Sequence, residues 1–233
     1  MNLIHGQPQP LELLCIAPHP DDAEIGAGGT LIKAARAGKA VGVLELTRGE
    51  MGTLGTPEIR LEETRRAAEI MNLNFRGNLE LPDGSIGLLE NDVLTLARAL
   101  RILRPRTLLL PHFQDRHPDH TASYQIGKRA VHLAGLSKAA LEGAPHKVGR
   151  VLLYQGNAPL EPTFLVDVSA QLETWERCVM AHTSQFNGGY VSETVTPDIL
   201  ERRRARMMYW GTFAGVRYAE AFVSEMPFLL EGL

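Results

Sequence analysis

The chain has 233 residues, 44% of them hydrophobic, which is enough apolar material for one sizeable core. With 24 Lys and Arg residues against 27 Asp and Glu residues, the formal net charge is −3, which offers no global basic surface for nucleic acid. No stretch approaches the ~20 apolar residues of a membrane-spanning helix, and the first fourteen residues lack the parts of a signal peptide, so we expect a cytoplasmic protein without a membrane partner. The two cysteines, Cys15 and Cys178, are too few for a disulfide framework or a four-thiolate zinc site and are expected to be reduced and buried.

Short runs rich in Leu, Val and Ile alternate along the chain with longer segments of helical pattern. An almost uniformly apolar run such as LELLCIA at 11–17 is typical of a strand covered on both faces. Strands are predicted at 11–17, 41–47, 75–81, 107–111, 151–154 and 164–168. Helices are predicted at 26–36, 57–71, 91–103, 119–134, 170–182 and 197–213. The alternation predicts an α/β fold with a mostly parallel sheet, in a single domain over residues 1–233.

Two similar tetrapeptides stand between a predicted strand and a predicted helix, HPDD at 19–22 and HPDH at 117–120. The proline in each disfavours helical geometry for the residue before it, so His19 and His117 are expected to end their strands. Loops at the carboxyl ends of parallel strands converge on one crevice, which is where α/β proteins bind their ligands. The two motifs are therefore expected to face each other across a single site, although they lie far apart in the sequence.

The residue types in these motifs are those of a catalytic metal site. A catalytic zinc ion takes three protein ligands from His and Asp or Glu and keeps a fourth position open for water. His19 and His120 can supply two nitrogens, and the first motif can supply a carboxylate, although the residues alone do not choose between Asp21 and Asp22. Zn²⁺ suits this mixed set, and Fe²⁺ or Mn²⁺ would fit it as well. Burying so many ionisable groups without a metal would be costly.

The segment APHPDDAEIG at 17–26 resembles the signature of the PIG-L/LmbE-like zinc N-deacetylases, and PHFQDRHPDH at 111–120 resembles their second motif. The similarity extends to 46–53, 60–63 and 215–220, so it covers nearly the whole chain. The bacillithiol-biosynthesis branch is the most similar, because a small residue, Ala23, follows the aspartate pair. The resemblance implies a Rossmann-like three-layer αβα fold and one zinc ion per subunit, bound by His19, Asp22 and His120. It also implies a homo-oligomer, with a hexamer among its forms.

The resemblance assigns roles to the other polar residues of the site. Asp21 is expected to act as the general base, and a protonated His117 is expected to stabilise the oxyanion. Asp119 is expected to accept a hydrogen bond from His117 and to raise its pKa. Arg60 is expected near the substrate, and Asp83 is a candidate for binding sugar hydroxyls, although the first also suits a helical ion pair and the second an ordinary turn.

These roles describe hydrolysis of the acetamide of an N-acetylglucosamine conjugate, with N-acetylglucosaminyl malate as the expected small-molecule substrate. Chitooligosaccharides such as diacetylchitobiose, and mycothiol-type intermediates, are the alternatives within this reaction class. A dinucleotide-binding enzyme is disfavoured because Leu31 stands where the GAGGTL segment at 26–31 needs a third glycine, and a two-metal phosphoesterase would need more bridging carboxylates. A non-enzymatic sugar-binding protein with a structural metal is the alternative from another class, but structural zinc sites usually have four protein ligands, rich in Cys.

Overall fold

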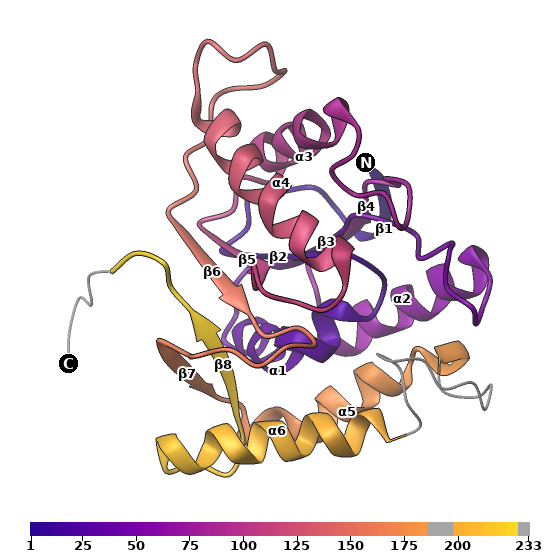
Figure 1. Cartoon of the computed structure of the whole chain (residues 1–233), viewed down its shortest axis with the longest axis vertical. Coiled ribbons are helices and arrows are strands. Elements are labelled where there is room, and N and C mark those ends of the chain that lie inside the picture. Colours follow the sequence, from indigo (N-terminus) through magenta and orange to yellow (C-terminus); the bar gives the residue numbers. More distant parts are fainter. Residues whose placement is uncertain (186–197, 228–233) are drawn as a thin grey trace.

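The computed structural model describes residues 1–185 and 198–227, and in this part of the chain an eight-stranded sheet is covered by helices on both faces (Figure 1). The strands are β1 (Asn2–Gly6), β2 (Leu13–Ala17), β3 (Val41–Glu45), β4 (Phe75–Asn78), β5 (Thr107–Pro111), β6 (Arg150–Tyr154), β7 (Phe164–Asp167) and β8 (Ala219–Val223). The helices are α1 (Asp22–Arg36), α2 (Pro57–Met71), α3 (Glu90–Leu103), α4 (Pro118–Gly135), α5 (Leu172–Met180) and α6 (Ile199–Ala214).

The sheet has the order β1-β4-β3-β2-β5-β6-β8-β7. From β4 through β3, β2 and β5 to β6, neighbouring strands run parallel, whereas β1 and β8 pair antiparallel with their neighbours. The mostly parallel sheet is therefore confirmed. From β2 the chain proceeds outward to β3 and β4, then returns to β5 on the other side of β2. This reversal makes the β2–β5 boundary the topological switch point, where α/β sheets bind ligands.

Helices α1, α2 and α5 cover one face of the sheet, and α3 and α4 cover the other (Figure 1). Side chains alternate along β2, so Leu13 and Cys15 enter the core under α1 and α5, while Leu14 and Ile16 enter the core under α3 and α4. The three-layer αβα fold is thus confirmed. Cys15 and Cys178 are buried free thiols, as expected. Of the helices in residues 1–185 and 198–227, none combines the length and the apolar character needed to cross a bilayer.

The structure differs from the predicted elements mainly at their ends. α1 begins at Asp22 rather than at residue 26, because Asp21 (φ 96°) turns the chain directly into the helix. β1 and β8 were not predicted, since β1 is a short and largely exposed edge strand and Glu220 interrupts the apolar run of β8. The first residue of the last predicted helix, at 197, lies outside the described residues.

Candidate active site

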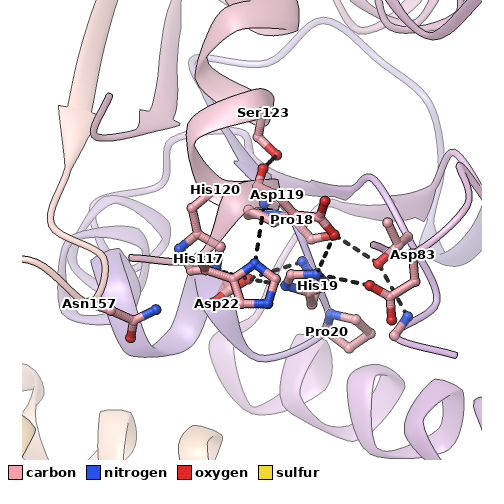
Figure 2. Close-up of polar contacts among 12 residues, drawn as sticks. Pro18, His19, Pro20, Asp22, Asp83, His117, Asp119, His120, Ser123 and Asn157 are labelled. Atoms are coloured by element: carbon pink, nitrogen blue, oxygen red, sulfur yellow. Dashed lines mark hydrogen bonds and ion pairs between the residues drawn. The ribbon is translucent and has the colours of Figure 1, made fainter. Parts of the chain in front are cut away.

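The two motifs meet where β2 and β5 lie side by side, beyond the carboxyl ends of both strands (Figure 2). Donor atoms of His19, Asp22 and His120 all lie within 4.8 Å of one another, and so do those of a second group, His19, His117 and Asp119. Asp22 Oδ2 is 3.1 Å from His19 Nδ1 and 3.2 Å from His120 Nε2. Two imidazole nitrogens and one carboxylate at this spacing fit a divalent cation with three protein ligands.

The backbone of the first motif turns its side chains toward this point. β2 ends at Ala17, and the chain crosses the end of the sheet to Asp21, whose φ of 96° is left-handed. Such a conformation is uncommon for residues other than glycine, is best tolerated by Asp and Asn, and clusters at functional sites. The turn places Asp21 and Asp22 on successive positions at the start of α1, where both line the same cavity.

His117 occupies the N-cap position of α4 in an extended conformation, as the proline after it requires. Both motif histidines lie beyond their strands, so the prediction that they end β2 and β5 is wrong, because proline imposes extended geometry without requiring strand pairing. His117 Nδ1 accepts the backbone N–H of Asp119 at 3.2 Å, which leaves the proton of the neutral ring on Nε2. The expected rise of its pKa is also wrong, since burial and the nearby rings of His19 and His120 lower the pKa of His117.

The Asp119 carboxylate contacts His19 instead of the expected His117. Asp119 Oδ2 lies 3.2 Å from His19 Nε2 and accepts the N–H of Gly84 at 2.8 Å. Asp83 Oδ1 lies 3.1 Å from the same nitrogen of His19 (Figure 2). The His19 ring therefore faces Asp22 through Nδ1 and two further carboxylates through Nε2. Carboxylate partners of this kind fix the orientation of a metal-binding histidine.

The donor groups strongly influence one another's protonation. Burial opposes a charge on His19, but hydrogen bonds to aspartates, Asp119 first among them, raise the pKa of His19 well above its ordinary value. Burial also opposes a charge on His120, yet the carboxylates of Asp22 and Asp115 raise its pKa to about 9. Burial alone would raise the pKa of Asp22, but His120 and His19 bring it well below its ordinary value. A cation bound here would thus replace protons on both histidines and find Asp22 already ionised.

Asp21 and Arg60 form the inner wall of the site. Asp21 is buried, and this burial raises its pKa to about 6, although the nearby Arg60 acts in the opposite direction. Arg60 is itself only 5% exposed. Its guanidinium donates to the carbonyl of Pro20 at 2.8 Å and to the carbonyl of Gly49 at 3.0 Å. Arg60 thus ties together the two loops beside Asp21, a contact that the sequence did not indicate.

The site opens into a cavity of about 290 Å³, close to the size of a small-molecule site. Ile25, Met51 and Leu54 give it an apolar wall, and Arg203 of α6 adds a buried cation. Asp119, which lies against His19, is not among the lining residues. The predicted site residues that line the cavity are His19, Asp21, Asp22, Arg60, Asp83, His117 and His120.

Several polar residues at or beside the site were not predicted from the sequence, among them Asp115, Asn157 and Arg203. Asp115 lies behind His120, with its Oδ2 3.3 Å from His120 Nδ1. Asn157, in the loop after β6, and Arg203 line the cavity. Asp115 could have been considered, because it stands two residues before the second motif. Asn157 and Arg203 carry no comparable signal, since only the packing of β6 and α6 brings them to the site.

A buried cluster of charged side chains, Arg76, Glu24 and Glu45, lies at the start of α1. Arg76 of β4 pairs with Glu24 of α1 and lies 2.6 Å from Glu45 of β3, and all three side chains are at most 1% exposed. Glu24 also lies 3.2 Å from His182 Nε2. Although burial favours the neutral carboxyl, the Arg76 guanidinium holds the pKa of Glu24 well below its ordinary value. The cluster therefore anchors the helix that carries Asp22.

Together, the switch-point location, the group of His19, Asp22 and His120 and the buried Asp21 are typical of a metal-dependent hydrolase. The family model for PIG-L, described as GlcNAc-PI de-N-acetylase, matches residues 14–131. The chain belongs to this family. It is accordingly an enzyme of the metal-dependent N-deacetylase class.

Individual relatives agree with this assignment. A diacetylchitobiose deacetylase of Thermococcus kodakarensis is 34% identical over 226 residues, covering 90% of this chain and 81% of the relative. The conserved protein TT1542 of Thermus thermophilus is 51% identical, with a TM-score of 0.88 over 94% of this chain and 97% of that one. The N,N'-diacetylchitobiose deacetylase of Pyrococcus horikoshii is 25% identical, with a TM-score of 0.78 over 91% of this chain and 82% of that one.

Proposed function

We propose that the protein is a zinc-dependent hydrolase that removes acetate from the amino group of an N-acetylglucosamine conjugate. The observation that carries this proposal is the convergence of His19, Asp22 and His120 on one point of the cavity, with Asp21 buried beside them. The family description and the deacetylase relatives support the same reaction. The donor set suits Zn²⁺, with Fe²⁺ and Mn²⁺ as the other candidates.

The residues around the metal position have distinct tasks in this reaction. When bound, zinc supplies Lewis acidity toward the acetamide carbonyl and makes water easier to deprotonate. Asp21 takes the proton of the attacking water as the general base, because it lines the cavity beside Asp22 without belonging to the donor group. His117 stabilises the oxyanion through its Nε2–H, since its Nδ1 accepts the backbone N–H of Asp119. The leaving amine then receives from Asp21 the proton that Asp21 took from the water, because a neutral His117 would become an imidazolate if it gave up its Nε2 proton.

Two candidate substrates are supported by different observations. N-acetylglucosaminyl malate is supported by the resemblance to the bacillithiol branch, and its carboxylates would meet a cavity that contains the buried Arg60 and Arg203. Diacetylchitobiose is supported by the Thermococcus kodakarensis relative. We retain Arg60 and Asp83 as substrate contacts, because both line the cavity in addition to their contacts with the protein.

Measuring acetate release from the two compounds in parallel tests both the proposed reaction and the choice of substrate. Asp21→Asn is the informative variant, because Asn tolerates the left-handed backbone at this position. Loss of the general base is expected to reduce turnover by about 10²–10⁴-fold while bound zinc stays unchanged. Full turnover in this variant would refute the assignment of Asp21 as the general base. If the wild type released acetate from none of the N-acetylglucosamine conjugates tried, the proposed function would be refuted.

We also propose that residues 1–233 form one domain and that the protein is a cytoplasmic homo-oligomer, with a hexamer as the form to test. The family resemblance supports this assembly. Light scattering of the purified full chain gives the mass in solution, and a monomeric mass would contradict the proposal.

A further inference from the structure

A second carboxylate stands behind His120, on the ring side that faces away from Asp22. The Asp115 side chain is 1% exposed, and its Oδ2 lies 3.3 Å from His120 Nδ1. Asp115 is itself held by two backbone N–H groups, from His117 to Oδ1 at 2.9 Å and from Asn157 to Oδ2 at 2.7 Å. Nδ1 of His120 lies within ion-pair distance of Asp115 but makes no aligned hydrogen bond. A carboxylate in this place orients a metal-binding imidazole, with Nε2 of His120 left for the cation.

The turn at Gly156 and Asn157 closes over this carboxylate (Figure 2 shows Asn157 on the His120 side of the site). A Cβ atom on Gly156 would lie 2.2 Å from Asp115 Oδ2 and 3.2 Å from His120 Nδ1. The backbone of residue 156 therefore packs directly against the pair, and the Asn157 N–H reaches Asp115 only because this turn is so close. A shift of the turn would move the carboxylate and, with it, the imidazole.

Helix α6 holds the turn in place. Arg203, 7% exposed, donates from Nη1 to the carbonyl of Gly156 at 2.7 Å and from Nη2 to Asn157 Oδ1 at 2.9 Å. Arg206 donates to the same Gly156 carbonyl at 2.7 Å. The planar guanidinium of Arg203 matches two acceptors of one turn at fixed geometry, which a lysine cannot do. Contacts thus run without a gap from α6 through the turn and Asp115 to His120.

We propose that Arg203 is a positioning residue for the metal site, acting through the Gly156–Asn157 turn and Asp115 on the orientation of His120. The proposal rests on the proposed function, because it requires that His120 bind the cation. It gives α6, which lies outside the family-matched residues 14–131, an indirect part in metal affinity. Relatives that lack this arginine would need another group to hold the turn.

Zn²⁺ affinity of the full chain, measured by competition with a chromogenic chelator, tests this proposal without reference to activity. Asp115→Asn should weaken Zn²⁺ binding by about 10–100-fold and Arg203→Ala by about 10-fold, because loss of outer partners typically costs this much. The double variant should bind no more weakly than Asp115→Asn alone, since both changes act along one path. The visible absorption of the Co²⁺-loaded protein should change in both single variants, which a general loss of stability would not cause.

Controls separate this inference from the proposed function. Arg202→Ala is the matched control, because Arg202 precedes Arg203 on α6 but its side chain is 65% exposed and pairs with Asp198. If His120→Ala binds Zn²⁺ as tightly as the wild type, the metal site itself is refuted. If His120→Ala loses Zn²⁺ but Arg203→Ala binds it like Arg202→Ala, the positioning role is refuted and the proposed function stands. Should Arg203→Ala not fold, Arg203→Lys replaces it; an intermediate affinity is expected, and wild-type affinity would overturn the proposal.

Discussion

Replacing Arg76 with Met removes the cation from the buried cluster below α1. The Arg76 and Glu24 side chains are 0% exposed and that of Glu45 is 1% exposed, so the change leaves two carboxylates buried without their guanidinium partner. Removing one partner of a buried ion pair costs about 3–5 kcal/mol, because the remaining charge stays desolvated. We expect the free energy of unfolding of Arg76→Met to fall by about this amount.

The loss should depend on pH in a defined direction. In the wild type the pKa of Glu24 is held well below its ordinary value, so ionised Glu24 stabilises the fold above that ordinary value, and the contribution is lost as pH falls. Without Arg76, burial raises the pKa of Glu24, so its contribution is instead lost as pH rises. The difference in unfolding free energy between variant and wild type should therefore be larger near pH 8 than near pH 5.

Urea denaturation followed by circular dichroism measures this difference at both pH values. Arg65→Met is the control, because Arg65 pairs with Glu62 on the exposed face of α2, where both side chains are 44% exposed. This control should change stability far less than Arg76→Met does. The reasoning is refuted if the two variants are equally stable, or if the effect of Arg76→Met is the same at both pH values.

Glu220, Gly26 and the metal centre can each be tested by a single change. Burial raises the pKa of Glu220 to about 7 despite hydrogen bonds from Thr30 and Gly29. The contribution of Glu220 to the free energy of unfolding is therefore present below the ordinary pKa of a glutamate and is lost as pH rises through about 7. In urea denaturation, Glu220→Gln should lose less stability than the wild type over this pH range, and equal losses in the two proteins would contradict the assignment. Gly26→Ala should destabilise the protein by about 1–3 kcal/mol in the same assay, because the new Cβ would lie 2.4 Å from Cδ2 of the buried Tyr154, and unchanged stability would show that the ring can move aside. Dialysis against a chelator should abolish acetate release, and zinc should restore it, while the far-UV circular dichroism spectrum persists, because neither apolar core contains His19, Asp22 or His120. Loss of the spectrum would indicate a structural metal.

Much of the architecture could be predicted from local patterns. The apolar run before the first motif becomes β2, buried on both faces, and Pro57 opens α2 at the predicted residue. The antiparallel strands β1 and β8 escaped prediction because an edge strand and a strand with a buried glutamate lack the uniform apolar pattern of the central strands. Their pairing depends on partners distant in the sequence, which no local window contains.

The chemical groups of the site could be read directly from two histidine–proline–aspartate motifs, which carry the nitrogens and carboxylates of a metal centre. Which partner each of these groups contacts depends on the three-dimensional packing. Asp119 contacts His19 rather than His117, and Arg203 reaches the turn beside Asp115 from the far end of the chain. Hydrogen bonds between side chains depend on distances of about 3 Å and on direction, and both are set by how the loops and α6 pack on the sheet.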